Sequence, residues 1–199
     1  MEFQRTAKFR FIVMSIIIVG GITYLSYPVQ KPKVTGAVQI VEQEEVKQTI
    51  TYEPVKSWIN SHAQRISEHE AALIMTECFN YPHPILLISL IEAESEFTPT
   101  AISSKGAIGL GQIMYDIHKK DLEKIGIKQR KDLFNIEKNI KATSFVLQMM
   151  MKKDKGDVVK ALHSYLGGKD GKYTNRIFTN YVCLSIELEL ANEKVMPRM

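Results

Sequence analysis

The chain has 199 residues, enough for one domain of ordinary size and a further segment. Its residues are 45% hydrophobic and 24% charged, a composition that permits a packed core and excludes disorder along the whole chain. The net charge of +4 suits an anionic surface such as phospholipid or cell wall, but the basic residues are too scattered to indicate a nucleic-acid-binding protein.

The first predicted element is an apolar segment at residues 11–27, which contains no charged residue. As a helix it would span about 26 Å, near the short limit for crossing a bilayer. Arg5, Lys8 and Arg10 precede it, so the positive-inside rule predicts a cytoplasmic basic tail at residues 1–10 and an external location for the chain beyond residue 27. The alternative is a cleaved signal peptide, but its best cleavage candidate, Ala37, lies ten residues beyond the apolar segment. We therefore expect an uncleaved transmembrane anchor.

Residues 28–64 are expected to form a linker or stalk, because they combine early prolines with mixed polarity and no long helical period. Within them the stretch VEQEEVKQTITY, residues 41–52, is compatible with a short helix or a strand. The helical pattern begins near residue 55, and we place the globular domain at residues 65–191, followed by a tail at 192–199.

The globular part shows helical signals only, without a hairpin pattern. Ser67 and Glu70 have the spacing of a capping box, Pro84 suits the first turn of an apolar helix, and Asp157 is a good N-cap. Gly167 and the glycine after it are typical of a helix end. Helices are expected at residues 67–81, 84–97, 112–126, 135–153, 157–168 and 172–194. The sequence thus predicts an all-α domain.

Cysteine and histidine give no sign of a metal or redox centre. Cys78 and Cys183 are the only cysteines, and both lie in apolar helical stretches. A disulfide is compatible with an external location, but two buried thiols are the simpler expectation. There is no CxxC or HExxH spacing, so neither a metal nor another cofactor is expected.

Three glutamates, Glu92, Glu94 and Glu96, end the apolar helix that starts at Pro84. At about 100° per residue, Glu92 and Glu96 share one face of the helix. Glu94 points about 200° away from them, on the apolar side that also carries Leu87. This geometry predicts that Glu92 and Glu96 are solvated and that Glu94 turns toward the apolar interior.

A carboxylate in an apolar environment needs either a proton or a cationic partner. Desolvation raises its pKa and keeps it protonated near neutral pH, as a general acid acting on a glycosidic oxygen requires. Pairing of Glu94 with a lysine or arginine elsewhere in the chain is the structural alternative. The residues by themselves leave both interpretations open.

A series of motifs in register around and after Glu94 resembles the soluble-lytic-transglycosylase (SLT) domain family. They are Glu94-Ser95 with Phe97, Pro99, Ala101 and Ser103; GAIGLGQIM at 106–114; Asn139-Ile140 within NIEKNI; ALHSYLGG at 161–168; and a last helix with Tyr173 and Tyr181. One such motif would be weak, but several in the family's order and spacing are specific.

The resemblance implies a lysozyme-like α-domain that cleaves the MurNAc–GlcNAc bond of peptidoglycan without water. Glu94 would protonate the leaving oxygen and then act as base on the C6 hydroxyl of the sugar, which closes a 1,6-anhydro ring. The substrate's N-acetyl group would take over the work of the second carboxylate that ordinary glycosidases use. Tyr165 resembles the family tyrosine that lies near the acid and orients it.

The resemblance also suggests substrate-binding residues, namely Ser95, Ser103, Gln112 and Met114. For the two serines a local backbone or turn role is equally compatible, and Met114 can instead fill the core. Gln112 can hold sugar hydroxyls as both donor and acceptor. The glycines of residues 106–111 would let the backbone approach a sugar closely or permit a positive φ in a turn.

The sequence departs from the family pattern at four positions. Gly111 stands where methionine is usual and Tyr115 where proline is usual, and Leu166 and Gly167 replace the usual asparagine and alanine. The loss of the asparagine should make the surroundings of Glu94 more apolar. The acid, Gln112 and the tyrosine are retained, so activity is still expected.

The first hypothesis is therefore a membrane-tethered lytic transglycosylase that opens the cell wall from outside the cytoplasm. It would act on the periplasmic side of a bacterial inner membrane or on a virion membrane. A hydrolysing, goose-type lysozyme is the second hypothesis, with Asp116 and Glu96 as the nearby candidates to activate water. The third is a wall-binding module of a secretion or conjugation system or of a phage particle.

Overall fold

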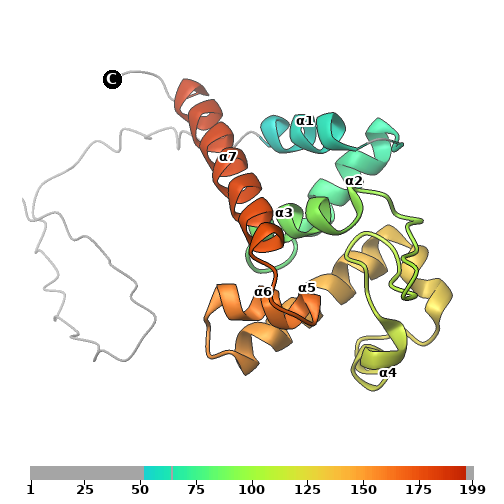
Figure 1. Cartoon of the computed structure of the whole chain (residues 1–199). Coiled ribbons are helices and arrows are strands. Elements are labelled where there is room, and N and C mark those ends of the chain that lie inside the picture. Colours follow the sequence, from blue (N-terminus) through green and yellow to red (C-terminus); the bar gives the residue numbers. More distant parts are fainter. Residues whose placement is uncertain (1–51, 64, 196–199) are drawn as a thin grey trace, which may run out of the picture. The chain divides into compact units, whose positions relative to one another are not determined.

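The computed structural model describes residues 52–63 and 65–195, and these belong to one compact unit, Val46–Met199. The described part is helical apart from isolated bridges that pair Ile108 with Ile102 and with Ile113 (Figure 1). The helices are α1 (Glu53–His62), α2 (Glu68–Cys78), α3 (Pro84–Ser95), α4 (Tyr115–Lys124), the 3-10 helix η1 (Arg130–Phe134), α5 (Ile136–Lys153), α6 (Val158–Leu166) and α7 (Gly171–Val195). The prediction of an all-α domain is confirmed for these residues.

The helix ends form where local side chains satisfy the free backbone groups. The hydroxyl of Ser67 accepts from the backbone N–H of Glu70, and the Glu70 carboxylate accepts from the backbone N–H of Ser67 at 2.8 Å, which completes the predicted capping box. Asp157 caps α6 through its side chain, and Gly167 ends that helix in the left-handed conformation with φ of 80°.

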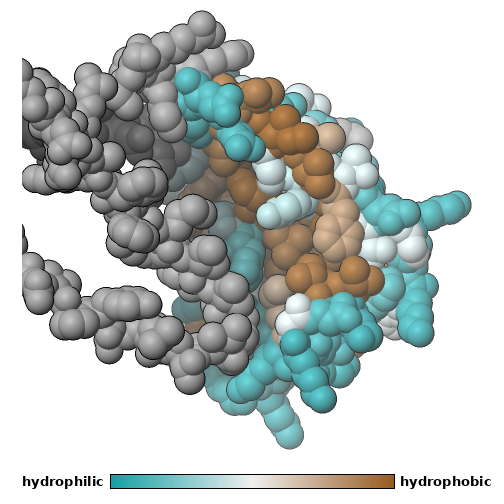
Figure 2. All heavy atoms as spheres, turned by 90° about the vertical axis from the view of Figure 1, so that its left-hand side faces the viewer, coloured by the Kyte–Doolittle hydropathy of each residue, from teal (hydrophilic) through white to brown (hydrophobic). Residues whose placement is uncertain are grey.

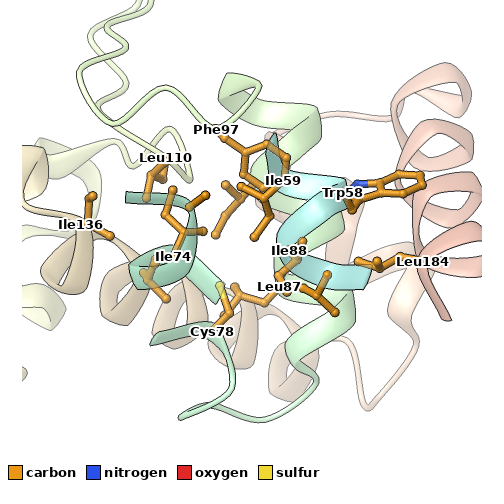
Figure 3. Packing of buried hydrophobic residues seen from close by; sticks show 14 residues of the cluster. Trp58, Ile59, Ile74, Cys78, Leu87, Ile88, Phe97, Leu110, Ile136 and Leu184 are labelled. Carbon is orange, nitrogen blue, oxygen red and sulfur yellow. The ribbon is translucent and has the colours of Figure 1, made fainter. Parts of the chain in front are cut away.

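Helix α3 lies at the centre of the main core, the cluster of buried apolar residues to which α1, α2 and α7 also contribute. Its Leu87, Ile88 and Ile91 are fully buried, as the almost uniformly apolar sequence predicts. Figure 3 shows side chains from α1, α2, α3 and α7 directed into this cluster, together with Phe97 from the segment after α3. On α2 the apolar face formed by Ala71, Ile74 and Cys78 is also fully buried. The last turn of α3 is therefore held from several sides.

The folded domain begins earlier than the predicted boundary at Arg65. Residues 53–62, the end of the segment assigned to a linker, form α1. Val55 and Ile59 are fully buried in the main core, and α1 contacts both α2 and α7. The physical reason is the spacing of Val55, Trp58 and Ile59, which places three apolar side chains on one face of a short helix.

The two cysteines are free thiols in different environments. Cys78 is buried in the main core, as predicted, and burial raises its pKa. Cys183 is exposed, so the expectation of a buried thiol is wrong there. Its neighbour Leu184 takes the inward position on α7 and is fully buried. The disulfide alternative is therefore excluded in this structure.

Helix α7 carries apolar side chains on its outer face as well. Val182, Ile186 and Leu190 lie at four-residue intervals, and each is about half exposed. Figure 2, which shows the side where α7 lies in Figure 1, has hydrophobic side chains gathered in a band. No described helix is both long and apolar enough to cross a membrane. The predicted anchor at 11–27 lies outside the described residues.

Candidate active site

Glu94 occupies the last turn of α3, immediately before a sharp change of chain direction. The helix ends at Ser95, and the next two residues, Glu96 and Phe97, have left-handed backbones with φ of 49° and 57°. Residues other than glycine seldom adopt this conformation, and such strain gathers at functional sites. Because the turn carries Phe97 into the core, where it is fully buried, the end of α3 is fixed in place.

The Glu94 carboxyl group is largely shielded from solvent and touches a tyrosine. The hydroxyl of Tyr173, at the start of α7, donates a hydrogen bond to Oε1 of Glu94. Burial raises the pKa of Glu94 to about 7, although the bond from Tyr173 lowers it. A carboxyl group of this kind holds its proton near neutral pH and can release it to a substrate oxygen. The predicted inward orientation of Glu94 agrees with this environment.

Tyr165, from the last turn of α6, lies beside the same carboxyl group. Burial and the neighbouring charge of Glu94 both raise the Tyr165 pKa, so this phenol stays protonated. Its hydroxyl donates to the carbonyl oxygen of Gly111 at 2.7 Å. Tyr165 therefore connects α6 to residues 106–114, the glycine-rich segment next to the acid. Its role in orienting the acid remains a prediction.

Glu92 is buried, so the prediction that it is solvated is wrong. Only 5% of Glu92 is exposed, and Arg176 of α7 binds its two carboxylate oxygens at 2.7 and 3.2 Å. Asn180 donates a further hydrogen bond to the same carboxylate. Glu96 is about half exposed and also meets Arg176, at 3.3 Å. Helix periodicity failed for Glu92 because α7, far along the chain, covers the face that local neighbours leave open.

Asn139 of α5 holds the glycine-rich segment in shape. Its side chain is 1% exposed and accepts from the backbone N–H of Gly111 at 2.9 Å. The same side chain donates to the carbonyl oxygens of Ile108 and Leu133, at 3.0 and 2.7 Å. One amide thus satisfies three backbone groups, two in the glycine-rich segment and one in η1. The motif Asn139-Ile140 is recognisable in the sequence, but these contacts cannot be read from it.

Two glycines of this segment, Gly109 and Gly111, lie too close to α5 for a side chain. A Cβ atom at Gly109 would lie 2.2 Å from the Asn139 side-chain nitrogen, and one at Gly111 would lie 1.9 Å from the hydroxyl oxygen of Thr143. Gly109 also has a positive φ of 71°. The departure from the family's methionine at position 111 is explained by Thr143, which leaves no room for a side chain.

The predicted substrate-binding residues are tied mainly into local backbone contacts. The hydroxyl of Ser95 donates to the Ile91 carbonyl at 3.3 Å, and that of Ser103 accepts from the Ala107 backbone N–H at 3.0 Å. Both serines therefore have local roles, and their binding to substrate stays a prediction. Met114 is half-buried and directly precedes α4.

Gln112 is also held by backbone contacts, and its binding to sugar stays a prediction. Its side-chain nitrogen donates to the carbonyl oxygens of Gly109 and Ala101, at 2.9 and 3.4 Å. Its backbone is left-handed, with φ of 48°, which is uncommon for a residue with a side chain. Leu166, the other departure near the acid, is 41% exposed.

The structure thus brings together Glu94, Tyr165, Tyr173 and the carbonyl of Gly111. Sequence reasoning places Tyr173 only in the last helix and misses its contact with the acid. The i, i+3 spacing of Tyr173 and Arg176 shows that they share a face of the last helix, but it does not show which helix that face meets, so the sequence contains no signal for the contact. No group of three or more histidine, cysteine, aspartate or glutamate side chains suited to a metal ion occurs among residues 52–63 and 65–195.

The raised pKa of Glu94 predicts a pH-dependent cost to stability. The unfolded chain releases this proton near pH 4.5, whereas the folded state keeps it up to about pH 7. Folded-state stability from this group is therefore present below pH 4.5 and is lost as the pH rises through 7. We expect Glu94→Gln to be more stable than the wild type above pH 7, by up to about 3 kcal/mol.

Urea unfolding of both proteins at pH 5 and pH 8 tests this prediction. The free-energy difference between the variant and the wild type should be clearly larger at pH 8. An equal difference at the two pH values would mean that Glu94 titrates normally in the folded protein.

Comparison with known families agrees with this site. Residues 72–176, more than half of the chain, match the family described as the transglycosylase SLT domain. The matched range begins in α2 and includes the acid, the glycine-rich segment, Asn139 and both tyrosines. Comparison with curated proteins gives no significant match. The chain therefore belongs to the transglycosylase SLT domain family, the lytic transglycosylases of peptidoglycan.

Proposed function

We propose that this protein cleaves the β-1,4 bond between MurNAc and GlcNAc in peptidoglycan and leaves 1,6-anhydro-MurNAc at the new end. The observation that carries the proposal is the environment of Glu94, a largely buried carboxyl group whose pKa is raised to about 7 and which is held by Tyr173. A group that is protonated near neutrality and can also hold a negative charge suits a reaction in which one residue is acid first and base second.

In the proposed reaction Glu94 gives its proton to the glycosidic oxygen, and the bond from that oxygen to C1 of MurNAc breaks. The substrate's N-acetyl group stabilises the charge that develops at C1. The Glu94 carboxylate then takes the proton of the C6 hydroxyl, whose oxygen bonds to C1. No water is consumed, and Glu94 ends protonated. The hydrogen bond from Tyr173 stabilises the carboxylate between the two steps.

The environments of the other nearby carboxylates favour this reaction over hydrolysis. A hydrolysing enzyme needs a second carboxylate free to activate water. Of the two candidates in the sequence, Glu96 is held by Arg176 at 3.3 Å, and Asp116 is held by Arg130 at 2.9 Å. These contacts support a mechanism that uses Glu94 alone.

The sequence also supports a location at a membrane. We propose that residues 11–27 anchor the chain and that the basic residues before them keep the N-terminus in the cytoplasm, so that the catalytic domain faces peptidoglycan outside. A protein placed in this manner would open the wall locally. Passage of a secretion or conjugation machine, or of phage material, is a process that needs such an opening.

Mass spectrometry of digested glycan tests the chemistry. The full chain in detergent is incubated with purified peptidoglycan glycan strands, and Glu94→Gln serves as the matched control. Products one water lighter than hydrolysis products are expected with the wild type and absent with the variant. Reducing ends of full mass would establish a hydrolase instead, and intact glycan would refute the proposed activity.

A further inference from the structure

We propose that the ion pair between Glu92 and Arg176 is a positioning device that holds Tyr173 against the acid, and that both residues influence the reaction only through Tyr173. This inference rests on the proposed role of Glu94. It gives a role to Glu92, which takes no part in the proposed proton transfer by Glu94.

The contacts form a ladder between the end of α3 and the start of α7. Tyr173, Arg176 and Asn180 are three and then four residues apart, so they share one face of α7. On the other side, Tyr173 meets Glu94, while Arg176 and Asn180 both meet Glu92. On α7, Tyr173 therefore lies one helical turn before Arg176. On α3, Glu94 lies two residues after Glu92.

The connection between α6 and α7 holds the backbone of Tyr173 but makes no hydrogen bond to its hydroxyl group. Two of its residues, Gly167 and Gly168, are glycines, and α7 itself begins at Gly171; a Cβ atom added at any of the three would meet no other atom within 4 Å. Glycine permits many backbone conformations, and the backbone after these glycines is held by Asp170, whose side chain accepts from the backbone N–H groups of Lys172 and Tyr173 at 2.8 and 3.3 Å. The direction of the Tyr173 hydroxyl relative to the acid is therefore left to the side-chain contacts between α7 and α3.

The Glu92–Arg176 pair has the directional character that such a contact needs. Arg176 places Nη2 on one carboxylate oxygen of Glu92 and Nε on the other, at 2.7 and 3.2 Å. A planar, two-point contact of this kind fixes orientation as well as distance. Glu92 is only 5% exposed, whereas the Arg176 side chain is 43% exposed, so solvent screens the pair in part.

Among the charged and titratable groups around Glu94, Tyr173 is the one that connects the Glu92–Arg176 ion pair to the acid. Tyr173 from α7 and Tyr165 from α6 face Glu94, and Tyr165 is held by the Gly111 carbonyl. Arg176 binds Glu92 and Glu96, which belong to the same end of α3 as the acid. Loosening of the ion pair should therefore reach Glu94 as the loss of the Tyr173 hydrogen bond.

A double-mutant cycle tests the inference. Glu92→Gln preserves shape but sets an amide N–H₂ group against the donors of Arg176 and Asn180, and Tyr173→Phe removes only the hydroxyl. Each single variant should lower kcat by about tenfold to a hundredfold, with a smaller change in KM. The double variant should be no worse than the more impaired single variant, because both act on one contact. Multiplied effects, or an unimpaired Glu92→Gln, would overturn the inference.

Leu184→Ala is the matched control for a purely structural effect. Leu184 is fully buried on the same helix and makes none of the ladder's hydrogen bonds, so its truncation destabilises α7 without removing any of them. The variant should unfold at lower urea concentration yet keep the wild-type kcat and pH profile. If it altered the pH profile as Glu92→Gln does, general loosening of α7 would explain the result, and the inference would fail.

A readout that does not require activity separates this inference from the proposed function. The titration of the Glu94 carboxyl carbon is followed by nuclear magnetic resonance in the wild type and in both single variants. Loss of the Tyr173 hydrogen bond should raise the Glu94 midpoint in Glu92→Gln and in Tyr173→Phe alike. An unchanged midpoint in Glu92→Gln would refute the positioning role, whereas failure to cleave glycan would refute only the function.

Discussion

Glycan cleavage by the Glu94→Gln variant is expected to fall by about 10²- to 10⁴-fold, the contribution typical of a positioned general acid. The amide has nearly the shape of the carboxyl group, and its oxygen can still accept the hydrogen bond from Tyr173. It cannot deliver a proton to the leaving oxygen or take one from the C6 hydroxyl. Release of soluble fragments from peptidoglycan, measured by chromatography at pH 6, gives the rate.

The control for this prediction is Glu123→Gln, the same chemical change at an exposed position of α4. It should leave the cleavage rate unchanged, and circular dichroism should show both variants folded. If Glu94→Gln retained the biological function of the wild type, a wall-binding module would describe the protein better than an enzyme.

The wild-type cleavage rate should also decrease at alkaline pH. Proton donation requires protonated Glu94, and the pKa of this group is raised to about 7 by burial. The rate is therefore expected to fall as the pH rises above 7. A rate that stayed constant up to pH 9, with the enzyme still folded, would contradict proton donation by Glu94.

The second large effect is expected from Asn139→Ala, which should lower the free energy of unfolding by about 3–5 kcal/mol. The alanine would leave the Gly111 N–H and the carbonyls of Ile108 and Leu133 without their partner in a buried environment. Urea denaturation followed by circular dichroism measures the change. Cleavage should decline as well, since Tyr165 binds the carbonyl of the same Gly111.

Asn135→Ala provides the matched comparison, because Asn135 lies one turn earlier and caps α5 through an exposed hydrogen bond. Loss of an N-cap costs about 1 kcal/mol. Equal destabilisation by the two substitutions would mean that Asn139 does not hold the glycine-rich segment in place.

Local physics made much of the fold predictable. The capping box of Ser67 and Glu70 and the cap at Asp157 involve atoms within a few residues, so the local sequence alone determines them. The central position of α3 could be predicted from its uniformly apolar sequence. Helix α1 was harder to recognise, because its apolar residues are few and its burial depends on α2 and α7.

The site was predictable to the extent that it depends on one helix and a family pattern. Helix geometry separated Glu94 from Glu92 correctly but misjudged the environment of Glu92, whose partner Arg176 lies 84 residues further along the chain. The contact of Tyr173 with the acid has the same origin in α7. Such long-range contacts depend on how helices cross, and the periodicity of a single helix contains no information about that.

The two left-handed residues directly after α3 limit how stable this protein can become. Glu96 and Phe97 each adopt a backbone that costs on the order of 1 kcal/mol for a residue with a side chain. Glycine at position 96 would remove that cost, but it would also remove the carboxylate that meets Arg176 and leave the end of α3 freer to move. The turn therefore lowers the stability of the fold but keeps the end of α3 rigid beside the acid. Substitutions at this turn that are selected only for a higher melting temperature should weaken catalysis.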